Sequence, residues 1–304
     1  MISKVFVIAT GGKLCYSFNF VTEDFVDKEI VSGFLSAFKD YAEEITAGKI
    51  LNFNFRNFNF IYDYDDDLDA MFVLVVDVSD LEEEVRDKLS LLKKEFLKRY
   101  RKDLEDWTGK INIFRDFDGF VRRNIFIPPK ILLTGTIGTG KTTLMNLFPG
   151  ETVLNLDEDL NEVIQKTINI SGLRGLKQFV IRELDLEDIV NNSKIYRELL
   201  NSIKVIIIMT NSSADNLAKT KKLYDSLKNL AKKADFYVIA NFQDLVNSVF
   251  KTEIIEKTFG VKTFTFSAIK IDAQQTLFSI MVQILKISFL SEYLKKLTSL
   301  VRPF

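Results

Sequence analysis

A glycine-rich loop between an apolar segment and an amphipathic one constrains this chain most. Residues 131–143 read ILLTGTIGTGKTT, with the pattern G-x-x-x-x-G-K-T where the two segments join. Gly135, Gly138 and Gly140 can adopt backbone conformations closed to residues with a Cβ, so that consecutive N–H groups can surround an anion. The segment therefore predicts a strand, a phosphate-binding loop and a helix. The alternative is a glycine turn followed by a solvated lysine.

The side chains of this loop have the chemistry that a nucleoside di- or triphosphate requires. We expect Lys141 to reach the β- and γ-phosphates and the Thr142 hydroxyl to bind Mg²⁺. The predicted nucleotide contacts cover the whole loop: Gly135, Thr136, Ile137, Gly138, Thr139, Gly140, Lys141, Thr142 and Thr143.

Composition narrows the chemistry further. The length of 304 residues suggests two domains. The chain has one cysteine and no histidine, which excludes histidine-dependent catalysis, histidine-bound metals and intrachain disulfides. A net charge of −1 without a long basic block argues against general nucleic-acid binding. We see no secretion signal or bilayer-spanning run, so we expect a cytoplasmic protein, with peripheral membrane association left open.

The adjacent Pro128 and Pro129 predict a domain boundary, because proline interrupts helices and central strands. We expect one domain at residues 1–127, a second at 130–288 and a helical extension at 289–304. The apolar stripe of the extension is consistent with packing on its own chain or with contact to a membrane or partner.

The first domain is expected to contain strand, strand, helix, three strands and helix. The spacing of apolar residues places these elements at residues 4–9, 14–20, 27–46, within 50–61, 71–78 and 81–104. Residues 63–69 are acidic and read as a solvated loop, with Ca²⁺ binding as the weaker alternative. The order predicts an α+β domain with an antiparallel five-stranded sheet.

This order, with Val76-Asp77-Val78-Ser79-Asp80 leading into the second helix, resembles the longin/roadblock family of profilin-like domains over about residues 1–127. The resemblance implies a platform without catalytic chemistry that dimerises or docks a protein partner.

Strands and helices alternate after the prolines, which predicts a mostly parallel sheet flanked by helices. Strands are expected at residues 131–133, 167–170, 179–184, 205–209, 236–240 and 263–266, and helices at 216–231, 245–258 and 273–290.

Two further motifs follow predicted strands of this domain. Residues 238–245, VIANFQDL, are similar to the Asn-Lys-x-Asp guanine motif of Arf-like GTPases, with Phe242 in place of lysine. Residues 266–269, FSAI, are similar to the family's Ser-Ala motif. Together with the loop, residues 130–287 resemble the Ras superfamily, with Arf-like and gliding-type GTPases closest. The resemblance implies GTP or GDP as ligand, contacted on the base side by Asn241, Phe242, Asp244, Ser267, Ala268 and Ile269.

The segments that would respond to the nucleotide depart from the family pattern. Asp185 is placed to hold Mg²⁺ through water, but neither the family's glycine nor its water-orienting glutamine follows it. Residues 157–159 are acidic where the family has a threonine, and they either help to hold a metal or face solvent. No catalytic residue can be assigned.

We therefore expect a guanine-nucleotide-binding module on a longin-like platform, acting as an atypical switch with slow GTP hydrolysis. The alternatives are a pseudo-GTPase scaffold that does not cycle nucleotide and, less favoured, a P-loop kinase or ATPase.

Overall fold

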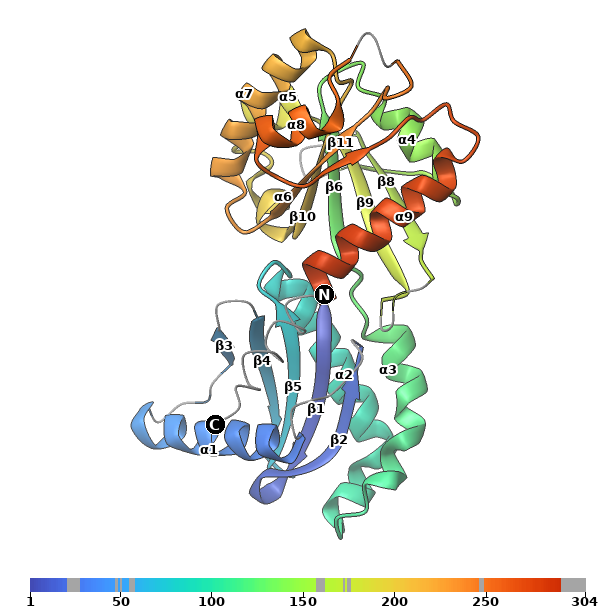
Figure 1. The fold of residues 1–304 in the computed structure, drawn as a ribbon. Helices are drawn as coiled ribbons and strands as arrows, with labels where there is room; N and C mark the ends of the chain where they lie inside the picture. Colours follow the sequence, from blue (N-terminus) through green and yellow to red (C-terminus); the bar gives the residue numbers. More distant parts are fainter. Residues whose placement is uncertain are drawn as a thin grey trace, which may run out of the picture. The chain divides into compact units, whose positions relative to one another are not determined.

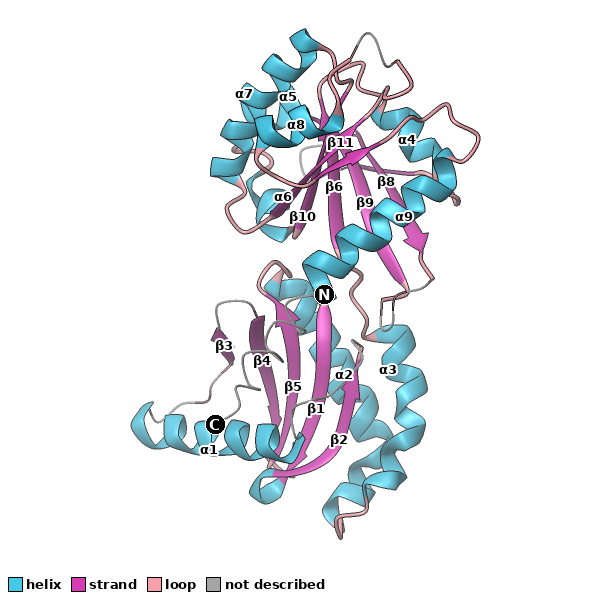
Figure 2. Cartoon of the chain, viewed as in Figure 1, coloured by secondary structure: helices cyan, strands magenta, loops and turns pink. Residues whose placement is uncertain are grey.

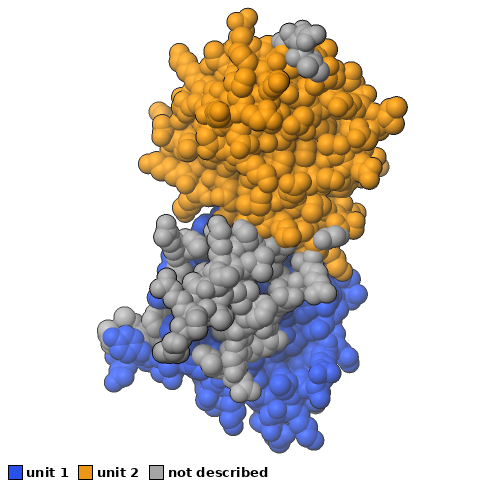
Figure 3. Space-filling view, in the orientation of Figure 1, with its two compact units in different colours: residues 1–128 blue, residues 129–304 orange. Residues whose placement is uncertain are grey.

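The computed structural model describes residues 1–20, 28–46, 49, 51–54, 58–156, 162–171, 173, 176–245 and 249–290. The chain divides into two compact units, Met1–Pro128 (unit 1) and Pro129–Phe304 (unit 2), between the two adjacent prolines (Figure 3). The expected extension at 289–304 lies almost entirely outside the described residues.

Unit 1 is built on a five-stranded antiparallel sheet with the order β2-β1-β5-β4-β3 (Figure 2). A tight turn at Thr10–Gly12 joins β1 to β2, and Gly11 and Gly12 provide the positive φ angles that it needs. The strands are β1 (Ile2–Ala9), β2 (Lys13–Asn19), β3 (Asn52–Asn54), β4 (Phe58–Asp65) and β5 (Ala70–Asp77), and the α-helices are α1 (Lys28–Thr46), α2 (Glu82–Glu105) and α3 (Asp118–Asn124).

Side chains that alternate along the strands give this sheet two apolar faces. Phe72 on one face packs against Phe96 of α2, with ring centroids 5.9 Å apart, and the same cluster includes Val121 of α3. Val73 on the opposite face clusters with Leu35 of α1. Helices therefore cover the sheet on both faces.

Unit 2 is built on a seven-stranded sheet with the order β12-β11-β10-β6-β9-β8-β7. The strands from β12 to β9 are parallel to their neighbours, whereas β8 and β7 pair in the antiparallel sense. The strands are β6 (Lys130–Gly135), β7 (Val153–Leu156), β8 (Glu162–Asn169), β9 (Gln178–Asp185), β10 (Val205–Thr210), β11 (Asp235–Ala240) and β12 (Thr263–Thr265).

Helices cover both faces of this sheet as well (Figure 1). α5 (Leu186–Asn191), α6 (Arg197–Ser202), α7 (Ala214–Leu230) and α8 (Thr252–Phe259) share one apolar cluster with the sheet. α4 (Lys141–Leu147) and α9 (Ala273–Leu285) lie on the other face. Because the carboxyl ends of parallel strands meet at one edge, the loops after β6, β9, β11 and β12 gather there.

The predicted pair of sheets, one antiparallel and one mostly parallel, is confirmed. Several element bounds differ. The helix expected at 245–258 begins only at Thr252. The acidic loop is shorter than predicted, because β4 continues through Asp65 and β5 starts at Ala70. β7, α3, α5 and α6 were not predicted. No helix in the described part of the chain has the length and apolarity needed to cross a bilayer.

Candidate functional site

The loop after β6 has a conformation that depends on its glycines. Gly138 and Gly140 have φ angles of 80° and 92°, in the left-handed region. A Cβ on Gly140 would lie 2.5 Å from Nδ2 of Asn241, and a Cβ on Gly135 would run into the carbonyl oxygen of Met209. The loop therefore needs glycine at position 138 for its backbone conformation and at position 135 for the close approach of Met209. Gly140 is needed for both reasons.

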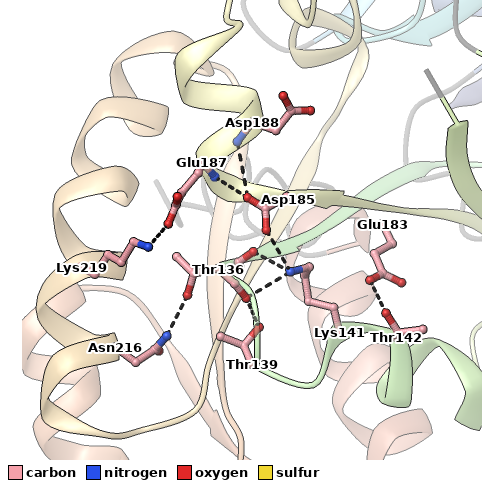
Figure 4. A network of polar contacts seen from close by, with 11 residues as sticks. Thr136, Thr139, Lys141, Thr142, Glu183, Asp185, Glu187, Asp188, Asn216 and Lys219 are labelled. Atoms are coloured by element: carbon pink, nitrogen blue, oxygen red, sulfur yellow. Dashed lines mark hydrogen bonds and ion pairs between the residues drawn. The ribbon is translucent and has the colours of Figure 1, made fainter. Parts of the chain in front are cut away.

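The inner surface of this loop presents hydrogen-bond donors. Within the described part of the chain, the backbone N–H groups of residues 137–140 donate to no other group. The Lys141 ammonium lies 2.7 Å from the Gly135 carbonyl oxygen and 3.1 Å from that of Thr136 (Figure 4). Free amides beside a fixed cation form an arrangement that can bind a phosphate group.

Two threonine contacts fix the shape of the loop. The Thr139 hydroxyl donates to the Thr136 carbonyl oxygen at 2.9 Å. The Thr136 hydroxyl accepts from the Asn216 amide of α7 at 2.7 Å (Figure 4). Asn216, which sequence reasoning missed, thus links the loop to the helix that covers one face of the sheet.

Asn241 connects the phosphate loop to two loops that follow later strands. It is 2% exposed, its Nδ2 donates to the Thr139 carbonyl oxygen at 3.0 Å, and its Oδ1 accepts from the Ala268 N–H at 3.3 Å. Asn241 directly follows β11, and Ala268 lies three residues beyond β12. One buried amide therefore holds together three loops that are distant in the sequence.

The other residues predicted to contact the base lie in the same two loops, after β11 and β12. Ser267 Oγ donates to Asp244 Oδ1 at 2.5 Å, and Oδ2 of that carboxylate takes no hydrogen bond from the described part of the chain. Phe242 has a φ angle of 61°, which is uncommon for a bulky residue. The Ile269 side chain is 78% exposed. The structure thus connects Asn241 and Ala268 to the predicted phosphate loop, joins Ser267 to Asp244, and leaves one oxygen of the Asp244 carboxylate without a hydrogen bond among the described residues.

The predicted metal-site residues are arranged differently from expectation. The Thr142 hydroxyl donates to Glu183 Oε1 at 2.8 Å, and its partner is thus two residues before Asp185 (Figure 4). Asp185 uses Oδ1 to accept from the backbone N–H groups of Glu187 and Asp188, and Oδ2 contacts the Lys141 ammonium at 3.4 Å. Asp185 therefore caps a helix and faces the loop cation.

The segment after Asp185 is a formed helix. Leu186 and Ile189 of α5 are fully buried in the cluster shared with α7. Glu187 pairs with Lys219 of α7, and the Tyr196 hydroxyl donates to Asp188. The missing glycine after Asp185 thus coincides with a capped, packed helix.

Sequence reasoning missed Glu183, although a signal was present. Side chains two positions apart in a strand point to the same face. A glutamate at position 183 of an otherwise apolar strand is therefore expected on the same face of the sheet as Asp185. The acidic residues 157–159 lie outside the described residues. In the described part, no three Asp, Glu or Cys side chains converge to hold a metal by themselves.

A separate open hollow of about 480 Å³ lies away from this loop. It is lined by residues of α6, the end of α7 and the segments beside them, including Lys194, Arg197, Lys232 and Lys233. None of the loop or base-side residues lines it.

No protein-family model matches the chain, and no curated protein has significant sequence similarity to it. The interpretation of the site therefore depends on its motifs and on the geometry described above.

Proposed function

We propose that unit 2 binds a guanine nucleotide, GDP or GTP, together with Mg²⁺, as a module of the Ras-like, Arf-like type. The observation that carries this proposal is the pair of hydrogen bonds in which Asn241 donates to the Thr139 carbonyl oxygen and accepts from the Ala268 N–H. Within the described residues, these bonds hold the loop after β6, in which the N–H groups of residues 137–140 are free, beside the loop after β11, in which Oδ2 of Asp244 is free. In the proposed complex, the phosphates contact the loop amides and Lys141.

Base selectivity follows from the chemistry of Asp244. Its Oδ2 would accept from guanine N1–H and the exocyclic amine, a charge-assisted pair. Adenine has neither donor at these positions and would leave the carboxylate unpaired, so we expect GDP to bind far more tightly than ADP.

Hydrolysis is proposed to be slow. The chain has no glutamine after Asp185 to orient water, and even complete Ras machinery hydrolyses GTP at only about 10⁻⁴ s⁻¹ without help. Nucleotide binding, and not rapid turnover, is therefore the proposed activity.

A scaffold that does not cycle nucleotide is the second candidate, and the capped helix α5 favours it. The segment that would respond to the γ-phosphate is held by Asp185, by a buried apolar face and by the Glu187–Lys219 pair. A scaffold predicts identical proteolysis patterns with GDP and with a non-hydrolysable GTP analogue, whereas a switch predicts different ones.

For unit 1 we propose a docking role in which the longin-like sheet and helices associate with a second copy of the chain. Light scattering on the full chain tests this, because a monomer at all concentrations would contradict self-association.

The nucleotide itself is tested by denaturing freshly purified protein and chromatographing what is released. We expect GDP or GTP, and its loss in Lys141→Ala but not in Lys257→Ala, which removes an exposed lysine of α8. An empty protein that binds no labelled GDP with Mg²⁺ would refute the proposal, and preference for ATP in competition would favour a kinase or ATPase.

A further inference from the structure

Glu183 holds a carboxylate beside the phosphate loop in a buried position. The residue is 8% exposed, and its Oε1 accepts the Thr142 hydroxyl proton at 2.8 Å (Figure 4). The second oxygen, Oε2, is buried and has no hydrogen-bond partner among the described residues. An orphaned carboxylate oxygen costs folding free energy that its single hydrogen bond does not recover, so a binding partner would explain its presence.

The neighbouring charges are already engaged. The Lys141 ammonium contacts the Gly135 and Thr136 carbonyl oxygens and Asp185, and Asp185 also caps α5. In the described part of the chain, no group of three acidic side chains is placed to bind a cation at Glu183. It would need further oxygen ligands, which nucleotide phosphates supply.

We propose that Glu183 is a metal ligand of the nucleotide site, and that Mg²⁺ is held by Glu183 Oε2, the Thr142 hydroxyl oxygen and phosphate oxygens. This assignment rests on the nucleotide binding proposed above. Mg²⁺ prefers oxygen ligands and is commonly bound by one or two carboxylates together with substrate phosphates. Thr142 can serve both partners, because its proton points to Glu183 while a lone pair stays available.

The assignment separates metal binding from the helix that follows. Glu183 lies within β9, a strand paired with β6 and β8, whereas Asp185 is the last residue of β9 and caps α5. The metal therefore controls nucleotide retention through a fixed strand and leaves α5 in place.

The test compares the affinity of a fluorescent GDP analogue in Mg²⁺ and in EDTA. Wild-type protein is expected to bind more tightly in Mg²⁺, and Glu183→Gln to lose about 10- to 100-fold of affinity in Mg²⁺ only, the range typical of removing a group that supports a metal site. In EDTA the two proteins should bind equally. Glu187→Gln removes the same charge at the Lys219 pair and should behave as wild type.

The outcomes distinguish the two proposals. Wild-type protein that binds no GDP in either condition overturns both. Wild-type binding with an unchanged Mg²⁺ dependence in Glu183→Gln overturns the Glu183 assignment alone, as does a dependence that disappears in Asp185→Asn but persists in Glu183→Gln.

A nucleotide-free readout separates a ligand from a structural residue. Removing an orphaned buried charge should leave the melting temperature of empty Glu183→Gln at or above that of wild type, and a clear fall would overturn the assignment. Glu183→Asp, which keeps the carboxylate on a shorter side chain, is a second variant for the affinity test. A weakened Mg²⁺ dependence then supports the proposal, and a wild-type dependence overturns it.

Discussion

Replacing Asn241 by alanine tests the junction of the three loops without assuming any ligand. The substitution removes the hydrogen bonds to the Thr139 carbonyl oxygen and from the Ala268 N–H, at 3.0 and 3.3 Å. Because Asn241 is 2% exposed, water cannot readily replace the lost partners. The variant therefore leaves the buried Thr139 carbonyl oxygen and the partly buried Ala268 N–H without these hydrogen bonds.

The expected loss of stability follows from these two bonds. Each group left without its partner costs about 1–3 kcal/mol, so for the two groups we expect unit 2 to lose about 2–6 kcal/mol. With a urea dependence of about 2 kcal/mol per molar, the unfolding midpoint should fall by roughly 1–3 M.

The chain offers a way to assign the transition to unit 2. Its single tryptophan, Trp107, belongs to unit 1, so tryptophan fluorescence follows that unit while far-UV circular dichroism follows both. Two units need not unfold in one step, and the two probes separate them. Asn241→Ala should shift the dichroism transition of unit 2 much more than the fluorescence transition of unit 1.

Asn229→Ala is the matched control. Asn229 is exposed near the end of α7, and an exposed substitution of this kind should change stability by less than about 0.5 kcal/mol. If Asn241→Ala unfolds at the wild-type midpoint, the hydrogen bonds to Thr139 and Ala268 do not hold the loops together, and the reasoning about the site is wrong.

Three further predictions use other parts of the chain. Gly140→Ala should destabilise unit 2 more than Gly138→Ala, because both have positive φ but only Gly140 faces Asn241; equal midpoints in urea would contradict this. Burial raises the pKa of the Cys15 thiol from 9.0 to about 12, so this group stabilises unit 1 below pH 9 and less as pH approaches 12. Iodoacetamide should accordingly label Cys15 at pH 9 slowly in the native protein and quickly in urea, and mass spectrometry showing fast native labelling would contradict burial. Phe242→Asn should relieve about 1 kcal/mol of backbone strain while weakening nucleotide binding through loss of the ring; a lower melting temperature would show that ring packing outweighs strain.

Much of the fold can be predicted from the sequence because its elements have strong local patterns. β10 is buried along its whole length, so its continuous apolar run marks a central parallel strand. The turn between β1 and β2 is marked by its two glycines. α5 and α6 have only six residues each, which is too short for a helical period to emerge from the sequence.

The site could be predicted where residue type and spacing determine the contact. The glycines of the phosphate loop and the amide at Asn241 are of this kind, since each fills a role that few other residues can. The partner of Thr142 could not be predicted in this way. The side chains of residues 183 and 185 point to the same face of β9. Only the three-dimensional contacts show that Glu183, and not Asp185, accepts the hydrogen bond from the Thr142 hydroxyl.

This shared face gives a physical reason for the different contacts of Glu183 and Asp185. A helix that starts directly after Asp185 needs a side chain to cap its first N–H groups, and Asp185 provides it. A carboxylate engaged in that way is less available to a metal, and the next residue toward the start of β9 that shares its face is Glu183. The α5 cap and the buried glutamate are therefore expected to have separate roles: a chain that kept the Asp185 cap but lacked Glu183 would retain its fold and lose the Mg²⁺ dependence of nucleotide binding.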